Sequence, residues 1–211
     1  MQRLVSAAAQ EFSQSGYRGS TTAAIAARAE ITEAQLFRYF DTKADLFRAA
    51  VSEPLNAAFA EFNARQLDTL PSPQDRHEAT GRYIADLRQF IAEHAKMLLC
   101  MLLAEAYSPD GIRGVGGLEA LGEYFRQGAD VMAGHLDANP RVAPELMVRV
   151  SFAAVLANEL FRDWLFPRDM ASEGEIEAAI ANFVLEGLAA NESSQNSTPS
   201  ENRKPGQRRK R

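Results

Sequence analysis

Residues 21–43 read TTAAIAARAEITEAQLFRYFDTK and carry the clearest structural signal in the chain. Thr21 suits an N-cap, because its hydroxyl can accept a hydrogen bond from a backbone amide of the first helical turn. The apolar residues that follow at the spacing of one helical face are Ile25, Ala26 and Ala29. We therefore predict a short helix after Thr21, ended by a turn at Glu30 and Ile31.

A second short helix follows this turn. Thr32 can cap it, and Gln35 three residues later completes a capping-box pattern. Leu36 and Phe40 are four residues apart and give this helix a buried side. The residues left facing outward are Glu33, Gln35, Arg38 and Tyr39. Two short helices joined by a tight turn, the second with a polar outer face, indicate a helix-turn-helix reader of DNA.

A larger set of residues keeps one spacing pattern with this motif. They are Ala8, Ala9, Phe12, Gly16, Tyr17, Ser20, Thr21, Thr22, Ile25, Ala26, Ala29, Ile31, Thr32, Leu36, Phe37, Tyr39, Phe40, Lys43 and Leu46. On these residues the sequence resembles the N-terminal DNA-binding domain of the TetR/AcrR family of bacterial regulators. The resemblance begins near residue 4 and covers about the first fifty residues. Beyond them only helical character and length fit the family.

Two positions depart from the family pattern. Glu30 stands where the turn usually has glycine, so this residue must accept or avoid a left-handed backbone at some cost. Glu33 stands where a basic residue is frequent, and a carboxylate can accept from a cytosine amino group but cannot attract a phosphate. Both departures bear on the target sequence more than on the fold.

The resemblance implies a set of DNA contacts in and around the second helix. They are Thr21, Thr32, Glu33, Gln35, Phe37, Arg38, Tyr39 and Lys43. A glutamine can bond adenine bidentately and an arginine can bond guanine in the same way. We expect phosphate contacts from Thr21, from Tyr39 and from the helix N-terminus at Lys43. Phe37, usually tyrosine in the family, can offer only apolar contact, for instance to a thymine methyl group.

Composition indicates an all-α protein. The 211 residues include only 13 Gly and 9 Pro, and Val, Ile and Thr show no sustained strand-like alternation. The one cysteine, Cys100, excludes an internal disulfide and suits a reducing compartment. The sequence contains neither a signal-peptide core nor an apolar run of membrane-spanning length. We therefore expect a soluble, cytoplasmic protein that does not partner a membrane.

Charge is distributed unevenly along the chain. The formal net charge is −5, but residues 1–50 carry six basic against five acidic residues, residues 51–190 eleven against twenty-one, and residues 191–211 six against two. DNA affinity depends on the local potential where phosphates lie and not on the total charge. An acidic body with a near-neutral reader is therefore compatible with binding DNA at one end.

We expect three segments: a helix-turn-helix domain at 1–48, a helical effector-binding and dimerisation domain at 49–190, and a disordered basic tail at 191–211. The helices expected besides the motif cover 2–15 up to Gly16, 43–66 with a kink at Pro54, 74–107 with a break near His94, 118–136, 145–166 and 173–190.

The last two of these helices are expected to form a dimer interface. The helix over 145–166 is apolar around so much of its circumference that one side of a small body cannot cover it. We predict a homodimer in which both helices pair with their symmetry mates as a four-helix bundle. The interface residues expected are Leu156, Leu160, Trp164, Ile180, Phe183 and Val184.

The resemblance also implies a small-molecule effector site in the body. The candidate lining residues are Phe90, Met97, Met101, Tyr124, Phe125 and Phe152. Such apolar stripes at helical spacing are more often plain core, and both interpretations stay open at this point.

The sequence offers little for catalysis, a cofactor or a metal. His77, His94 and His135 are far apart, no HExxH pattern occurs, and Cys100 lies in the apolar run MLLCMLL as an inert buried thiol.

The resemblance implies a repressor of double-stranded operator DNA that a small-molecule effector releases. Two alternatives remain: an activator on the same scaffold, and a helical ligand-binding or catalytic bundle that no longer reads DNA. Glu30, Glu33 and the start of the first helix almost at Met1, where the family usually has an arm, keep the latter open. Either the arm is lacking or the true start lies upstream.

Overall fold

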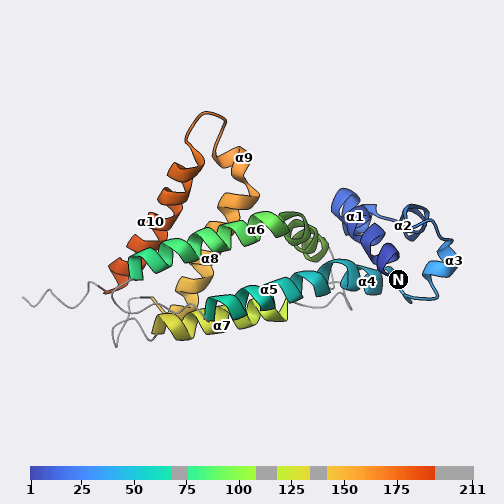
Figure 1. Cartoon of the computed structure of the whole chain (residues 1–211), viewed down its shortest axis with the longest axis horizontal. Coiled ribbons are helices and arrows are strands. Elements are labelled where there is room, and N and C mark those ends of the chain that lie inside the picture. The colour runs from blue at the N-terminus through green and yellow to red at the C-terminus, as the bar shows by residue number, and fades with distance from the viewer. Residues whose placement is uncertain (68–75, 108–117, 134–141, 193–211) are drawn as a thin grey trace, which may run out of the picture.

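The computed structural model describes residues 1–67, 76–107, 118–133 and 142–192, and within these ranges every regular element is a helix. The prediction of an all-α protein is confirmed. The helices of the N-terminal unit lie at one end of an elongated molecule, and the remaining helices form a body at the other end (Figure 1).

The N-terminal unit consists of α1 (Gln2–Gly19), α2 (Thr22–Arg28) and α3 (Glu33–Leu36). Gly16 has φ 68° and ψ 172°, a conformation that is essentially restricted to glycine. The helix therefore changes direction at the predicted position, but a further turn extends it to Gly19. The fully buried side chains of its core include Phe12, Ile25 and Leu36, together with Leu46 and Phe47 of the helix that follows.

One helical path leads from the N-terminal unit into the body. It consists of α4 (Lys43–Phe47), the π-helical turn η1 (Arg48–Ser52) and α5 (Glu53–Leu67). The backbone N–H of Glu53 bonds the carbonyl of Arg48, five residues back, directly before Pro54. Because proline has no amide donor and clashes with the carbonyl four residues earlier, a wider turn at this point accommodates it. The disturbance predicted at Pro54 is therefore a π-turn.

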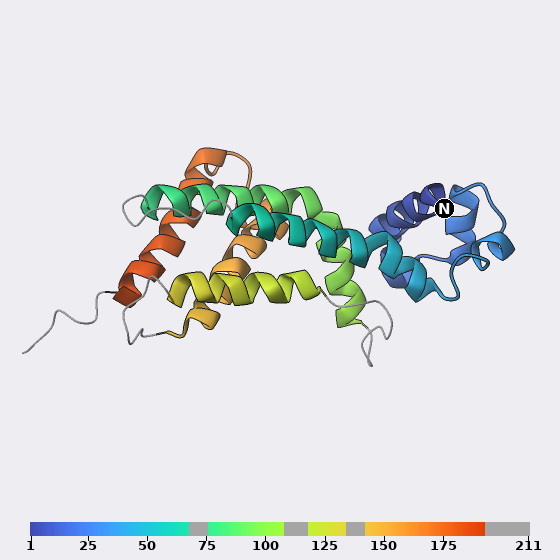
Figure 2. The same cartoon turned by 60° about the horizontal axis from the view of Figure 1, so that its bottom comes forward.

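The body is built from α6 (Arg76–Ala106), α7 (Glu119–Ala133), α8 (Pro144–Leu160), α9 (Arg162–Leu165) and α10 (Glu173–Glu192). The break expected near His94 is wrong, since α6 is one helix, but its axis turns sharply toward its C-terminal end (Figure 2). His94 Nδ1 lies 2.8 Å from the Phe90 carbonyl oxygen. The single helix expected over 145–166 is also wrong, because Phe161 (φ −107°, ψ 20°) separates α8 from α9. The helix ends expected at residues 74 and 136 lie outside the described residues.

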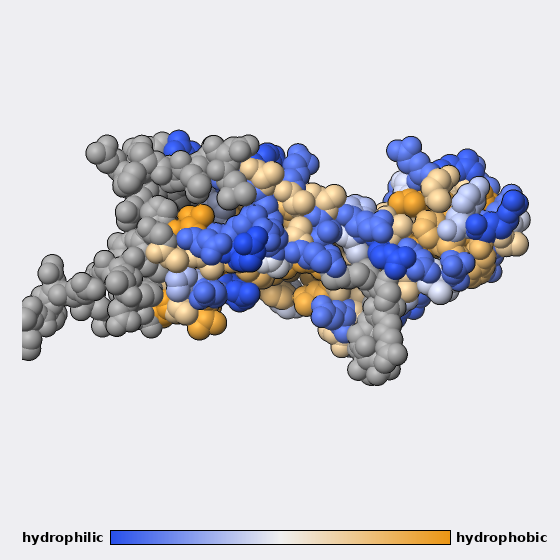
Figure 3. All heavy atoms as spheres, turned by 90° about the horizontal axis from the view of Figure 1, so that it is seen from below, coloured by the Kyte–Doolittle hydropathy of each residue, from blue (hydrophilic) through white to orange (hydrophobic). Residues whose placement is uncertain are grey.

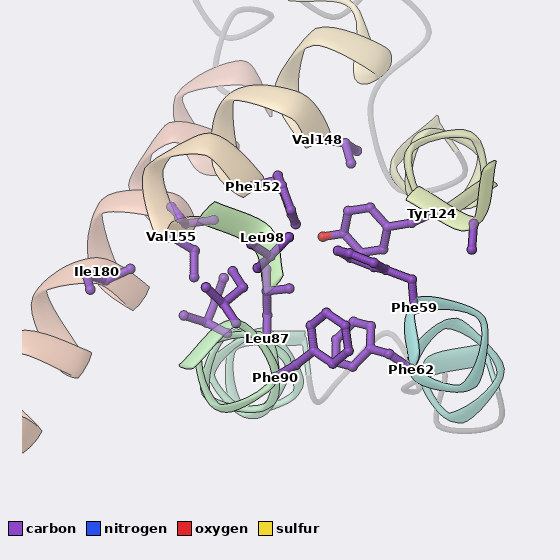
Figure 4. Close-up of a cluster of buried hydrophobic side chains, with 14 of the residues drawn as sticks. Phe59, Phe62, Leu87, Phe90, Leu98, Tyr124, Val148, Phe152, Val155 and Ile180 are labelled. Carbon is purple, nitrogen blue, oxygen red and sulfur yellow. The ribbon is translucent and has the colours of Figure 1, made fainter. Parts of the chain in front are cut away.

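Two hydrophobic cores meet on α6. The body core lies between α5, α6, α7, α8 and α10 and is rich in aromatic rings, among them Phe59, Phe62, Phe90, Tyr124 and Phe152 (Figure 4). The N-terminal core takes in Cys100 and Ala104 near the end of α6. Since α6 contributes to both cores, the two units are joined by packing as well as by the α4–α5 path. The tail expected at 191–211 lies almost wholly outside the described residues, and α10 continues to Glu192.

Candidate nucleic-acid interface and body core

The turn between α2 and α3 is set by backbone hydrogen bonds. Thr21 Oγ1 accepts from the N–H of Ala24 at 3.1 Å, as expected of an N-cap. Glu30 adopts the left-handed conformation with φ 56°, and the N–H of Ile31 donates to the Ala26 carbonyl at 3.0 Å. Glu30 therefore takes the backbone that glycine would adopt at lower cost.

The capping box predicted for α3 is present. The N–H of Thr32 donates to Gln35 Oε1 at 2.8 Å, and the N–H of Gln35 donates to Thr32 Oγ1 at 3.2 Å. Leu36 is fully buried and anchors α3 on the N-terminal core. The sequence predicts Gln35 both in this cap and in contact with adenine. A bidentate contact with adenine would compete with the cap for the same amide oxygen.

The outer face of α3 and of the turn after it is exposed. Phe37 and Tyr39 are 46% and 56% exposed, and Glu33 and Arg38 are exposed as well. Thr22 Oγ1 donates a hydrogen bond to Glu33 Oε1, a contact that sequence spacing did not predict. The Arg38 side chain forms no hydrogen bond or ion pair within the described ranges, so its guanidinium is available to a ligand.

The start of α4 differs from the expected phosphate site. Lys43 Nζ donates to the Ser20 carbonyl at 2.9 Å and lies 4.5 Å from the centroid of the Tyr17 ring, and burial lowers the pKa of Lys43. The N–H of Thr42 donates to Asp45 Oδ2 and the N–H of Asp45 to Thr42 Oγ1, both at 3.1 Å. Hydrogen bonds from Thr42 and the nearby Arg48 lower the pKa of Asp45. The Asp45 carboxylate therefore accepts from the Thr42 amide, the Thr42 hydroxyl accepts from the Asp45 amide, and the Lys43 ammonium points toward the Ser20 carbonyl and the Tyr17 ring.

An ion pair holds α2 on α1. Arg28 Nη2 lies 2.9 Å from Glu11 Oε2, and the Glu11 side chain is largely buried. Hydrogen bonds from Arg28 and Ser15 lower the pKa of Glu11. Arg3 pairs with Glu30 at 3.2 Å, but both side chains are exposed, so this pair contributes little to stability.

The residues predicted to line an effector site divide into two groups. Phe90, Tyr124 and Phe152 are buried in the body core and pack against neighbouring rings, with centroids 5.4 Å apart for Tyr124 and Phe152 (Figure 4). Phe125 is partly buried beside them, 5.3 Å from Phe152. Met97 and Met101 are partly buried and pack against both the body core and the N-terminal core. Ser52 Oγ donates to Met101 Sδ at 3.2 Å.

Polar groups that the sequence analysis missed lie in the body core. The hydroxyls of Tyr83 and Tyr124 are hydrogen-bonded to each other, and burial raises the pKa of Tyr124 to about 12. Asn63 Nδ2 donates to the Ala120 carbonyl at 2.9 Å, and Asn56 Oδ1 accepts from the N–H of Ala120 at 2.9 Å. Periodicity places these residues on helices but does not show that they meet across α5, α6 and α7.

The residues predicted for the dimer interface are split between surface and interior. Trp164 and Phe183 are 82% and 67% exposed, and Leu156 and Leu160 are partly buried. Ile180 (Figure 4) and Val184 are buried in the body core of their own chain. Other large apolar side chains exposed on α8, on α9 and after them are Leu146, Val150, Phe161, Leu165 and Met170. Figure 3 shows hydrophobic residues at the surface of both the body and the N-terminal unit.

A buried ionic network fixes the position of α9 and α10. Arg88 Nε on α6 lies 2.6 Å from Glu159 Oε1 on α8, and its Nη1 lies 3.5 Å from Glu177 Oε2 on α10. Arg162 on α9 pairs with Glu159 at 3.5 Å and with Glu173. Because Arg88 and Glu159 are only 10% and 7% exposed, loss of their mutual contact would leave each buried charge with only its longer ionic contacts.

Two further properties concern the described part of the chain. Within it, no three His, Cys, Asp or Glu side chains lie together in a metal-binding arrangement. None of its helices has the length and apolar character needed to span a bilayer.

Comparison with known proteins identifies the N-terminal unit. Residues 4–50 match the family model described as bacterial regulatory proteins, tetR family. No curated protein gives a significant sequence match.

Solved structures share the fold over most of the chain. A TetR-like transcriptional regulator from Rhodococcus sp. RHA1 is 21% identical, with 89% of this chain and 94% of that chain covered and a TM-score of 0.65. AibR in complex with isovaleryl coenzyme A and operator DNA is 16% identical, with 86% and 96% covered and a TM-score of 0.64. FadR from Bacillus subtilis in complex with stearoyl-CoA is 16% identical, with 90% and 98% covered and a TM-score of 0.63. Most of the chain therefore has the fold of these regulators.

Proposed function

From the premise that the chain belongs to the tetR family of bacterial regulatory proteins through its N-terminal domain, residues 4–50, we propose that it is a dimeric, sequence-specific DNA-binding repressor. The observation that carries this proposal is the exposed face of α3. Its outward side chains are available to contact DNA. Leu36 holds the helix on the N-terminal core, and the Thr32–Gln35 capping box fixes the start of the helix. A rigid short helix with an exposed outer face fits the major groove of duplex DNA.

The dimer is proposed to form through α8, α9 and the outer side of α10. Leu146 and Val150 are four residues apart on α8 and are 57% and 64% exposed, and Trp164 on α9 and Phe183 on α10 are exposed as well. So many large exposed apolar side chains indicate a protein interface. This surface retains Trp164 and Phe183 from the sequence prediction and omits Ile180 and Val184, because both already pack in the body core.

A twofold dimer would place two copies of α3 in successive major grooves. Their half-site centres would lie about 34–36 Å apart on an inverted repeat. Repression would follow from occlusion of the promoter.

The body is proposed to bind a small-molecule effector that releases the DNA. Two of the similar structures contain acyl-CoA ligands, and the aromatic core here offers the apolar lining for a ligand. Met97 and Met101 contact both cores, so a change in the body packing at α6 would reach the N-terminal unit. An effector can release DNA only through different affinities for the DNA-bound and free conformers.

Selection from random duplex DNA by the purified full-length chain, at moderate salt, tests DNA reading. We expect enrichment of an inverted repeat with half-sites one helical turn apart. Enrichment of no sequence would contradict the proposal and favour a ligand-binding bundle without DNA reading.

The interface is tested with a matched pair of substitutions. Leu146→Asp should convert the dimer into a monomer in light scattering, because it places a charge in the apolar contact. Leu102→Asp alters a leucine of similar exposure, 52%, on α6 outside the proposed interface and should leave the dimer intact. A dimeric Leu146→Asp variant would exclude this interface.

Isovaleryl-CoA and stearoyl-CoA are the first probes for the effector. Release of the selected operator by either, measured by fluorescence anisotropy, would assign acyl-CoA thioesters as the effector class. If neither changes the DNA affinity or the melting temperature, this class is excluded.

A further inference from the structure

The outer face of α3 is unusually poor in cations and rich in apolar surface. Ala34 and Phe37 are three residues apart and therefore neighbours on one face, and both are exposed. Glu33 and Arg38 flank them, so the formal charges of this face cancel. Such a face gains little binding free energy from contacts with phosphates. Its sequence specificity must come from contacts with base edges.

Glu33 is held in one orientation by the preceding helix. The Thr22 hydroxyl donates to Glu33 Oε1, and Oε2 has no partner within the described ranges. An ionised carboxylate only accepts hydrogen bonds, so the free oxygen can select only a base that presents a donor. In the major groove, cytosine presents its N4 amino group without a neighbouring acceptor on the same base, whereas adenine presents N6 beside the acceptor N7. Cytosine is therefore the better match.

Phe37 has no polar atom beyond its backbone and is 46% exposed. Its side chain lies four residues after Glu33, on the adjacent turn of the same face. The one apolar group on the major-groove edges of the base pairs is the C5-methyl group of thymine. Burial of Phe37 against this methyl group would remove apolar surface of both partners from water.

We propose that two side chains of α3 and of the turn after it each read a pyrimidine in every operator half-site, with Glu33 accepting from a cytosine amino group and Phe37 contacting a thymine methyl group. This inference rests on the proposed function, since it assigns the bases that the same surface recognises. Gln35 has no direct role in it, because its amide oxygen caps α3.

Uracil substitution tests the contact of Phe37. Each thymine of the selected operator is replaced by 2′-deoxyuridine, which removes only the methyl group, and the Kd of the full-length chain is measured by fluorescence anisotropy. We expect one thymine per half-site at which the wild-type Kd rises about three- to fivefold, the effect of one buried methyl group. In Phe37→Ala the same replacement should have no effect.

Tyr39→Ala is the matched control, because it removes another exposed aromatic side chain and should retain the wild-type response to uracil. An equal rise of the Kd on uracil substitution in wild type and Phe37→Ala, or no rise at any thymine, would overturn the role of Phe37. Melting temperatures close to that of the wild type establish that both variants are folded.

Glu33→Gln tests the second contact. A glutamine both donates and accepts, so the preferred base at one position per half-site should change from cytosine to adenine when the selection is repeated. An unchanged preference at every position would overturn the role of Glu33. If the wild-type chain enriches an inverted repeat but neither substitution alters its reading, only this inference fails; if it enriches nothing, the proposed function itself fails.

Discussion

Cys100 Sγ donates a weak hydrogen bond to the backbone carbonyl of Phe12 at 3.4 Å, across 88 positions of sequence. The thiol belongs to α6 and the carbonyl to α1, so this contact lies where the body meets the N-terminal unit. Ala104, one turn after Cys100, is also buried against the N-terminal core. A rearrangement of the body that moves α6 must therefore move or repack α1.

The thiol at this junction should be unreactive in the folded protein. Burial raises the pKa of Cys100 to about 11, and the residue is 4% exposed. Since the thiolate is the nucleophile, almost none of it is present at neutral pH. Ellman's reagent should therefore label the native chain far more slowly than the chain in guanidinium chloride. Equal rates in the two solvents would contradict this placement of Cys100.

Acid should weaken the N-terminal unit through Glu11. Arg28 and Ser15 lower the pKa of Glu11 in the folded state. The ionised Glu11 side chain therefore contributes stability at pH values above its unfolded pKa of about 4.3. This contribution is lost as the pH falls through the pKa of Glu11 in the folded protein. Glu11→Gln should be less stable than wild type at neutral pH, with the difference shrinking at low pH. Denaturant unfolding across this range measures it.

Glu105→Gln serves as the control, since Glu105 is exposed and forms no ion pair within the described ranges. This variant should retain the pH dependence of the wild type. A Glu11→Gln variant whose stability falls in parallel with that of wild type at every pH would contradict the assignment.

Gly16→Ala should destabilise the fold by about 1–3 kcal/mol through backbone strain. A Cβ at Gly16 would meet no atom within 4 Å, so the cost arises from φ 68° alone. Gly81→Ala, in the interior of α6 with equally open space, should instead stabilise by about 0.5–1 kcal/mol. Chemical denaturation compares the free energies of unfolding of the two variants. Changes of the same sign would contradict the positive φ of Gly16 in α1.

Gly128→Ala should disturb the packing of α7 on α8. Its Cβ would lie 2.9 Å from Val148 Cγ1, so we expect a loss of about 1–3 kcal/mol from overpacking. Gly122→Ala lies on the same helix with no atom within 4 Å and should be stabilising. The loss at Gly128 should largely disappear in the double variant with Val148→Ala. If it persists there, α7 and α8 do not approach each other as described.

The helix-turn-helix was predictable because local rules determine it. The Thr21 cap, the Thr32–Gln35 box and the turn at Glu30 depend on neighbouring residues, and all three are present. The break expected near His94 and the single helix expected over 145–166 were both wrong. The continuity of α6 and the interruption at Phe161 depend on tertiary packing. Periodicity marked Ile180 and Val184 as apolar, but it does not distinguish a helix face toward its own core from one toward a partner.

Side chains with two possible partners were the least predictable part of the candidate site. The sequence shows that Lys43 and Asp45 lie at a helix start, where an anion is favourable. It does not show that Asp45 itself supplies the anion, or that Lys43 donates to Ser20. The pairing of Thr22 with Glu33 likewise depends on the angle between α2 and α3.

The most direct test of DNA reading by α3 compares the base preferences of the wild type and Arg38→Ala in parallel selections from random duplexes. The Arg38 guanidinium is exposed and has no hydrogen-bond or ion-pair partner within the described ranges. Arg168→Ala, in the body, is the control. We predict that Arg38→Ala loses the preference for one guanine per half-site while the rest of the inverted repeat and the control profile stay unchanged. An unaltered profile for Arg38→Ala, with equal weakening on all sequences, would contradict base reading by Arg38 and reduce it to a phosphate contact.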